Sequence, residues 1–364
     1  MRVALITTVW HNVGDDFVRA GIKYLLKKMW PDKYFKFENI HKHAPITARY
    51  GFSRVRKNFD KLDRLLPLKW TRDRILESDL VVQCGAPIYW CHDSVNAHCY
   101  DNEWFEPLII RRLSKKSTST FLNIAGGSCQ TYHSDSSEIC SSCRQYIGSL
   151  YDAAEVTTLR DELAGALLEQ AGGKAPVLPC TSLFAADEHN IQTCTSDYVA
   201  LNFMPLAGHY AFGQSIDSAR WQSVMLKFYA DIRKRARIIF ACHDVQEIEA
   251  ARSIDPQAEL FYADNHIDYL KFYAHAGFGI VNRLHAALAL AGLGKPALVI
   301  GNDTRTRMVD LIQGQRLYVN DATVDSLVEH FGELEDKARD YETAIRNIKQ
   351  KAQDDYMNAL ADVL

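Results

Sequence analysis

The sequence predicts an α/β protein with two Rossmann-like domains, each built around a parallel sheet, that face each other across a cleft. Three observations support this prediction. Short β-branched runs alternate with helical patterns through almost the whole chain, which is typical of parallel sheets with helices on both faces. The alternation lapses once, in a polar stretch at residues 181–197, and then restarts. The length of 364 residues also favours two domains.

The first domain opens with residues 3–9 (VALITTV), an apolar run of the kind found in strands buried on both faces of a sheet. A helix is expected from about Asp15 and another at residues 102–116. A third is expected at residues 160–172, where a Gly-Gly pair provides a C-terminal stop. Further strands are expected at residues 33–40, 79–85, 120–127, 155–160 and 176–180.

The second domain repeats the pattern after the polar stretch. Its expected strands are residues 198–204, 237–244, 258–263, 278–282, 296–301 and 316–320. The residues after about Val324 are charged and helix-forming, and we expect them to end the second domain and to pack back across the first. The predicted boundaries are therefore 1–185 for the first domain and 196–364 for the second, joined by a linker.

Composition excludes several classes of protein. Apolar residues make up 47% and charged residues 24%, as in soluble globular proteins. The formal net charge of -3 argues against a nucleic-acid partner. The N-terminus does not have the pattern of a signal peptide, and no apolar run is long enough to span a membrane. Nine cysteines, an odd number, indicate reduced thiols, so we expect a cytoplasmic protein.

A basic segment lies between residues 41 and 74, where ten Lys or Arg stand against three Asp. Aromatic residues are interleaved with the charges at Tyr50, Phe52, Phe59 and Trp70. One interpretation is a solvated helical insertion. The other is a surface for an anionic partner, either a lipid-linked glycan at an anionic membrane or an acidic glycan.

Ligands of open parallel sheets bind at the carboxyl ends of the strands, so polar residues just after strands are candidate site residues. After the first strand, Gly14 would allow a tight turn, and Asp15 or Asp16 would cap the following helix. The alternative is a functional carboxylate that accepts a proton from a sugar hydroxyl. The glycines do not form G-x-G-x-x-G, so a nicotinamide site is not indicated.

Two further strand ends carry arginines. Arg160 follows a strand of the first domain and would either form a salt bridge at the sheet edge or point into the cleft as an anion clamp. Arg305 and Arg307 follow a strand of the second domain and offer the same choice. If these arginines converge with Arg283, they imply a small, multiply charged substrate, because one carboxylate would not need so many.

The stretch VNRLHAALALAGLGKP (281–296) joins Arg283 and His285 to an almost wholly apolar helix. If these residues are extended before the helix begins, both side chains point one way and Leu284 points the other. The helix must be buried, so its N-terminus would aim free N–H groups and a positive dipole into the cleft. Together these groups make an anion site; the alternative is a histidine hydrogen-bonded for structure alone.

A cysteine-rich stretch offers a separate possibility. Cys129, His133, Cys140 and Cys143 lie within residues 129–143, and the last two form C-x-x-C. Four ligands of this type can bind zinc tetrahedrally. The outer spacings match no standard zinc finger, so free thiols at the start of a helix are the default interpretation.

Four motifs resemble the polysaccharide pyruvyl transferase family. They are NVGDDFVRAGI (12–22), DLVVQCGA (79–86), LRDELAGALL (159–168) and NRLHAALALAGLGKP (282–296), the last followed by an arginine-rich strand. They occur in the family's order and cover most of the chain, and the R-x-H with G-x-P downstream is the most specific. The chain departs from the family at CGAPIYW (84–90), where a glycine cluster is usual, and at Asn302, which stands at about a tyrosine position.

The resemblance implies a GT-B-like fold and a transferase (EC 2.5.1 type) that moves a pyruvyl group from phosphoenolpyruvate onto sugar hydroxyls in cell-surface polysaccharide synthesis. It implies that Arg160 and Arg283 bind the donor's anionic groups and that His285 is the general acid. Asp15 is the second catalytic candidate. The other residues assigned to substrate binding are Asn12, Gly14, Leu284 and Arg305. No cofactor beyond the donor substrate is required.

Two alternatives remain open. One is a nucleotide-sugar glycosyltransferase on the same scaffold. Such enzymes often use a glutamate of the second domain on the ribose, but residues 277–328 contain no Glu, which counts against it. The other is a non-catalytic metal or redox module built on the cysteine-rich stretch.

Overall fold

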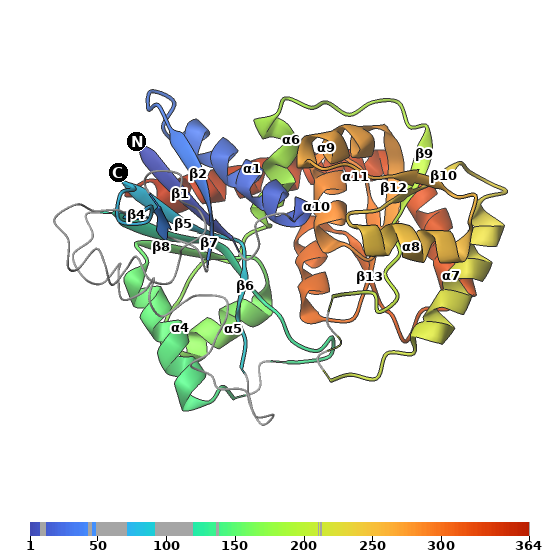
Figure 1. The fold of residues 1–364 in the computed structure, drawn as a ribbon, viewed down its shortest axis with the longest axis horizontal. Coiled ribbons are helices and arrows are strands. Elements are labelled where there is room, and N and C mark those ends of the chain that lie inside the picture. Colours follow the sequence, from blue (N-terminus) through green and yellow to red (C-terminus); the bar gives the residue numbers. More distant parts are fainter. Residues whose placement is uncertain are drawn as a thin grey trace.

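The structure is a computed structural model that describes residues 1–7, 12–42, 46–48, 71–91, 119–135, 138–209, 211 and 213–363. These residues form two parallel sheets that lie side by side, with helices around each (Figure 1). The helix expected at residues 102–116 and most of the basic segment lie outside the described residues. Among the helices that are described, none is long and apolar enough to cross a bilayer.

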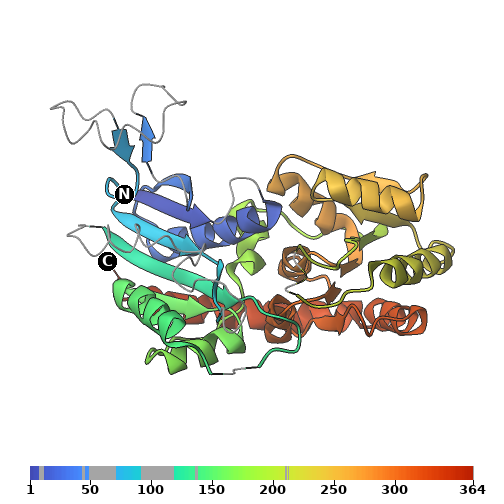
Figure 2. The same ribbon diagram turned by 60° about the horizontal axis from the view of Figure 1, so that its bottom comes forward.

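The first sheet has the strand order β2-β1-β5-β7-β6, and β8 pairs with β7. Its strands are β1 Arg2–Thr7, β2 Lys36–His41, β5 Leu80–Cys84, β6 Pro87–Tyr89, β7 Thr120–Ser128 and β8 Val156–Leu159. All of these pairs are parallel. Two short strands, β3 Ile46–Ala48 and β4 Thr71–Asp73, form an antiparallel pair that stands apart from the main sheet (Figure 2).

The strand expected at residues 176–180 is not formed. Only Val177 bridges the sheet, opposite Leu159, while Leu178 donates to the Leu159 carbonyl. The stretch is bounded by Pro176 and Pro179, which have no N–H to donate. The ladder therefore stops after one bridge. The other first-domain strands predicted from the sequence are confirmed.

The second sheet has the order β11-β10-β9-β12-β13-β14, and every pair is parallel. Its strands are β9 Tyr198–Leu201, β10 Ile238–Ala241, β11 Glu259–Phe261, β12 Ala276–Val281, β13 Ala297–Gly301 and β14 Gln315–Tyr318. All six predicted strands of the second half are confirmed. Their alternation with helices along the sequence is what a parallel sheet requires.

The helical segments cover the faces of both sheets (Figure 1). They are α1 Val13–Met29, α4 Ser141–Ala153, α5 Glu162–Gln170, η2 Thr181–Phe184, α6 Ala185–Glu188, α7 Ser218–Ile232, α8 Val245–Ile254, α9 His266–His275, α10 Leu284–Gly292, η3 Thr304–Ile312 and α11 Val324–Leu360. Asp161 caps α5, as its position after a strand predicts, by accepting from the Ala164 N–H at 2.8 Å.

The two halves share a packed apolar core. One buried cluster includes Phe17 of α1, Phe184 of η2 and Leu290 of α10. The first residues of the expected linker, 181–188, are helical and mostly buried, because they pack between these two helices. The long α11 also contacts the first half, where the Tyr356 hydroxyl donates to the Pro179 carbonyl at 2.9 Å.

Gly21 of α1 lets these helices approach closely. A Cβ at this position would lie 1.7 Å from the Thr181 carbonyl oxygen. We expect Gly21→Ala to lower the free energy of unfolding by about 3 kcal/mol, since backbone must move to make room. The matched control is Gly332→Ala in α11, where nothing lies within 4 Å of the added Cβ. It should raise stability by up to about 1 kcal/mol through helix propensity. Equal effects in denaturant titrations would contradict this packing.

Candidate functional site between the two halves

The candidate site lies where strand ends of the first sheet meet the second half. Nη1 of Arg160, just after β8, is 3.5 Å from Nε2 of His285 in α10. Beside it, Thr304 at the start of η3 accepts from the Gln130 N–H at 2.9 Å. The Thr304 hydroxyl also lies 3.2 Å from that of Ser128, at the end of β7. Residues far apart in the sequence are therefore brought together at the carboxyl ends of both sheets.

The apolar helix predicted after Val281 is confirmed as α10, and its residues 286–291 are all buried. The extended arrangement predicted through His285 was wrong, because the helix already begins at Leu284. Arg283 is the N-cap residue and makes no side-chain capping bond, so among the described residues no side chain caps this helix. The Ala286 N–H already donates to the Arg283 carbonyl at 3.0 Å, so the start of α10 offers an anion chiefly the positive end of its helix dipole at Leu284 and His285.

His285 is held in its neutral form. Burial, together with the guanidinium groups of Arg160, Arg305 and Arg283, lowers its pKa well below the usual value. An imidazole in this environment donates a proton only if negative charge arrives beside it. The site is therefore suited to an anionic ligand that raises the pKa of this histidine.

Arg160 is a buried cation whose charge has no carboxylate partner among the described residues. Only 1% of the residue is exposed. Its Nη1 reaches Cys180 Sγ at 3.9 Å, and its Nε is buried without a hydrogen-bond partner. Glycine makes this placement possible, because a Cβ on Gly127 would lie 2.4 Å from that Nε. An uncompensated buried guanidinium is costly, and an anionic group beside Arg160 would offset that cost.

The start of α1 lies against the same histidine. A Cβ on Gly14 would be 2.5 Å from Nδ1 of His285, so only glycine fits here without displacement. The prediction that Asp15 or Asp16 caps α1 was wrong, since the helix begins at Val13. The cap is Asn12, which accepts from the Gly14 N–H at 2.9 Å. The structure thus brings the NVGDD motif to the candidate site.

Arg283 faces a different set of side chains. Its Nη2 lies 2.5 Å from Asp244, and its Nε donates to Glu247. Its third contact is with Nε2 of His209. Two carboxylates of its own half therefore already neutralise this guanidinium. The structure does not pair it with His285 in the predicted way; the guanidinium nearest His285 is that of Arg160.

Sequence reasoning missed the polar group that surrounds Arg283. His243 and Asp244 lie in the loop between β10 and α8, and Glu247 lies in the first turn of α8. The His243 N–H donates to Glu247 at 2.7 Å. The signal was present as ACHDVQE (241–247), a polar run at a strand end.

The two arginines predicted after β13, Arg305 and Arg307, contact different parts of the molecule. Arg305 forms a bidentate ion pair with Asp303, with N···O distances of 2.9 and 2.7 Å. It also lies close enough to contribute to the lowered pKa of His285. Arg307 instead donates to the carbonyls of Tyr132 and Ser134 in the first half. Arg305 thus belongs to the field around His285, whereas Arg307 joins the two halves.

Leu284, a predicted site residue, and Asn302, the departure from the family pattern, both have structural contacts. Leu284 is partly buried and packs against the core cluster around α10. Asn302 is fully buried, and its amide donates to the Leu206 carbonyl at 2.9 Å. The Asn302 side chain also occupies the space beside Gly208, where a Cβ would lie 2.4 Å from its Oδ1.

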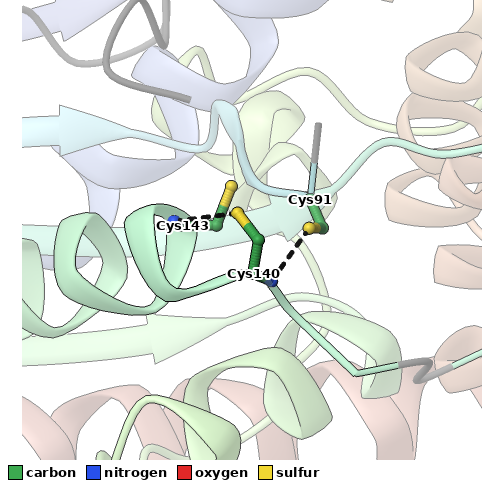
Figure 3. Close-up of side chains that lie close together, drawn as sticks. All are labelled: Cys91, Cys140 and Cys143. Atoms are coloured by element: carbon green, nitrogen blue, oxygen red, sulfur yellow. Dashed lines mark hydrogen bonds between the residues drawn. The ribbon is translucent and has the colours of Figure 1, made fainter. Parts of the chain in front are cut away.

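The structure does not bring together the four residues considered as an alternative metal set, Cys129, His133, Cys140 and Cys143. Cys129 follows the end of β7 and lies at the candidate site, where its neighbours include Arg305 and Asp303 and burial raises its pKa to about 12. The ring of His133 instead lies against Tyr132 and Tyr318, with centroids 5.1 and 4.8 Å away. The thiols of Cys140 and Cys143 have a different neighbour, Cys91 (Figure 3).

Partly buried histidines make stability depend on pH. The pKa of His266 is lowered to about 4, and the pKa values of His243 and His285 lie well below the usual value, chiefly because the protein shields these rings from water. Free histidine titrates near about 6.5, so on acidification the unfolded chain gains protons before the folded chain does. We expect the free energy of unfolding to fall as pH drops from about 6.5, by up to about 1.4 kcal/mol per pH unit for each histidine.

Denaturant titrations between about pH 7 and about pH 5 would measure this slope, above the range in which most carboxylates titrate. Replacement of His266 by asparagine should make the slope shallower. A midpoint that stays constant or rises on acidification would contradict the burial of neutral histidines.

Comparison with known proteins agrees with this arrangement. Residues 12–304 match the family model described as polysaccharide pyruvyl transferase. No curated protein matches the chain. Similar solved structures include the S. aureus MnaA–UDP complex, with a TM-score of 0.55, 13% identity and coverage of 94% of this chain and 90% of that one. UDP-GlcNAc 2-epimerase from Neisseria meningitidis bound to UDP-GlcNAc has a TM-score of 0.52, 12% identity and coverage of 99% and 100%.

These identities establish likeness of fold alone, and the predicted GT-B-like architecture is confirmed. The match to the family model also indicates function, because the model spans most of the chain and includes all four motifs. Membership indicates a transferase of polysaccharide synthesis. On this evidence, the chain belongs to the polysaccharide pyruvyl transferase family.

Proposed function

We propose that the protein transfers a pyruvyl group from phosphoenolpyruvate onto hydroxyls of a saccharide acceptor during cell-surface polysaccharide or glycoconjugate synthesis. The observation that carries this proposal is Arg160, a buried guanidinium without a carboxylate partner among the described residues, 3.5 Å from His285. A ligand with several negative charges would satisfy both this guanidinium and the uncapped start of α10.

Phosphoenolpyruvate fits these requirements because it carries a phosphate and a carboxylate on three carbons. Arg160 and the α10 N-terminus would bind one anionic group, and Arg305 would contribute to binding the other. The Arg305 side chain is 23% exposed, so it can give up one of its hydrogen bonds to Asp303 and donate to the ligand instead. Arg283 would act indirectly, because Asp244 and Glu247 already hold it in place.

Ketal formation begins when the methylene carbon of the donor takes up a proton, which leaves an oxocarbenium-like centre at C2. A sugar oxygen attacks C2 and loses its proton. The C–O bond to phosphate then breaks, and a second sugar hydroxyl attacks and loses its proton to complete the ketal. We assign the first proton transfer to His285, because the bound dianion would raise its lowered pKa.

The acceptor would approach from the first half. Gly14 lies against His285 and Asn12 caps the same helix, so the first turn of α1 borders the reacting centre. Asp15 lies in that turn and is our candidate for accepting a proton from a sugar hydroxyl. We propose that the protein works in the cytoplasm without a further cofactor, and that the basic segment at 41–74 contacts a lipid-linked acceptor or an anionic membrane.

One observation favours a second candidate. The S. aureus and N. meningitidis structures of similar fold contain UDP or UDP-GlcNAc, so a nucleotide-sugar glycosyltransferase is the alternative. Glu247 is the carboxylate of the second half that could bind a ribose, but it is paired with Arg283.

The test is a transfer assay with phosphoenolpyruvate and a panel of lipid-linked oligosaccharides that end in hexose or N-acetylhexosamine. We expect phosphate release together with an acceptor mass gain of one pyruvate less one water. Release of a nucleoside diphosphate from a nucleotide sugar, with transfer of the sugar to the same acceptors, would contradict the proposal.

A further inference from the structure

A cluster of three cysteines lies apart from the residues assigned to the transfer reaction. Cys91 follows β6, Cys140 is the N-cap residue of α4, and Cys143 lies in the first turn of that helix. Their three sulfur atoms all lie within 4.8 Å of one another. Figure 3 shows the three side chains close together, one from the loop after β6 and two from the start of α4.

We propose that Cys91, Cys140 and Cys143 bind one Zn²⁺ ion as thiolates. Zinc binds thiolate sulfur at about 2.3 Å in tetrahedral geometry, which places two sulfurs of one site about 3.8 Å apart. The sulfurs therefore need to close by at most about 1 Å, which side-chain rotation can supply. They provide three of the four tetrahedral ligands and leave one position for a further donor.

Backbone N–H groups already orient two of the sulfurs. The Cys143 N–H donates to Sγ of Cys140 at 3.4 Å, and the Cys140 N–H donates to Sγ of Cys91 at 3.3 Å. Hydrogen bonds of this kind stabilise thiolate over thiol and fix the direction of the lone pairs. The start of α4 adds the positive end of a helix dipole, which favours negative sulfur.

The surroundings suit a structural ion. Cys143 is 1% exposed and belongs to a buried apolar cluster that also contains Ile139 and Ile147. Cys91 and Cys140 pack against the edge of the same cluster. Cys140 also lines a surface hollow with Arg144, so an ion has a path from solvent.

The ion would fasten the end of β6 to the start of α4. β6 carries Tyr89, whose hydroxyl accepts from the Asn123 amide at 2.8 Å in the middle of β7. In the described structure β6 pairs with β7 only through Pro87 and Tyr89, so few hydrogen bonds hold this edge strand. A metal ion bound to Cys91 would therefore help to hold it in place. The expected role is stability of this part of the first sheet.

The two sulfurs of C-x-x-C at a helix start also suit a dithiol that cycles with a disulfide. A third sulfur within the same 4.8 Å favours the metal, because a two-cysteine redox pair does not need it. The disulfide is therefore the competing outcome of the test.

The experiment uses the full chain, purified without chelator, and measures zinc by mass spectrometry. Reconstitution with Co²⁺ then reports ligand type through thiolate-to-cobalt charge-transfer absorption. We expect about one zinc per chain, an intense thiolate band with Co²⁺, and a melting temperature that falls when a chelator removes the ion. Cys91→Ser and Cys140→Ser should weaken Zn²⁺ binding by at least about tenfold.

The matched control is Cys194→Ser, since Cys194 is exposed and lies outside the cluster. It should keep zinc content, spectrum and melting temperature. The Co²⁺ spectrum of the unaltered chain decides the question even if a serine variant does not fold. A chain that holds no zinc and shows no thiolate band, or that contains a Cys140–Cys143 disulfide by peptide mapping, would overturn the proposal. Unchanged zinc affinity in the folded Cys91→Ser variant would overturn it as well.

Discussion

Replacing His285 with alanine is expected to slow phosphate release from phosphoenolpyruvate by about a thousandfold, since loss of a general acid costs this much in many enzymes. His285 is the candidate donor because its Nε2 lies 3.5 Å from Nη1 of Arg160, which we expect to bind the donor's anionic group. The side chain is partly buried at the start of α10, and its removal leaves the buried residues 286–291 in place. Donor affinity should fall far less than turnover.

Steady-state phosphate release at saturating donor measures this effect. His275→Ala is the matched control, because His275 ends α9 and its ring pairs with the exposed Asp197 at 3.5 Å. It should retain full activity. Turnover of the His285→Ala variant within a few fold of the unaltered chain would show that another group protonates the donor.

Arg160→Met is expected to weaken ligand binding without lowering the stability of the fold. Removal of a buried cation that lacks a carboxylate partner should leave the free energy of unfolding unchanged or raise it by about 1 kcal/mol or more. Affinity for phosphoenolpyruvate should fall by about 30- to 100-fold, the loss expected for charge-assisted hydrogen bonds. Arg160→Lys should bind weakly as well, because an ammonium cannot present the planar fork of donors.

Arg283→Met is expected to have the opposite effect on stability from Arg160→Met. Arg283 is paired with Asp244 and the buried Glu247, so its removal leaves a buried negative charge and should lower stability by about 3–5 kcal/mol. Denaturant titration and calorimetry of both variants make the comparison. If Arg160→Met unfolds as readily as Arg283→Met and still binds the donor, Arg160 is a structural cation and not the anion clamp.

The fold was largely predictable because its strands are short β-branched runs separated by helical patterns. Those runs depend on local composition, so all six strands of the second sheet could be found from the sequence. The stretch 176–180 was misassigned because its two prolines limit pairing to a single bridge. The helical form of 181–188 escaped prediction since it depends on packing against α1 and α10.

The site was predictable only in part. Reading the residues after each strand identified Arg160 and His285, since the carboxyl ends of parallel strands gather ligand-binding groups. Which side chains meet across the two halves depends on contacts more than one hundred residues apart in sequence, such as the one between Arg160 and His285. For the same reason, sequence spacing grouped Cys129 with Cys140, whereas the fold places Cys91 there.

The central claim is that the candidate site between the two halves binds phosphoenolpyruvate through Arg160 and His285, and calorimetric titration tests it most directly. The full chain would be titrated in turn with phosphoenolpyruvate, UDP-GlcNAc and other nucleotide sugars. We predict one phosphoenolpyruvate per chain, with affinity lost in Arg160→Met, and no binding of the nucleotide sugars. Binding of a nucleotide sugar without binding of phosphoenolpyruvate would contradict the account.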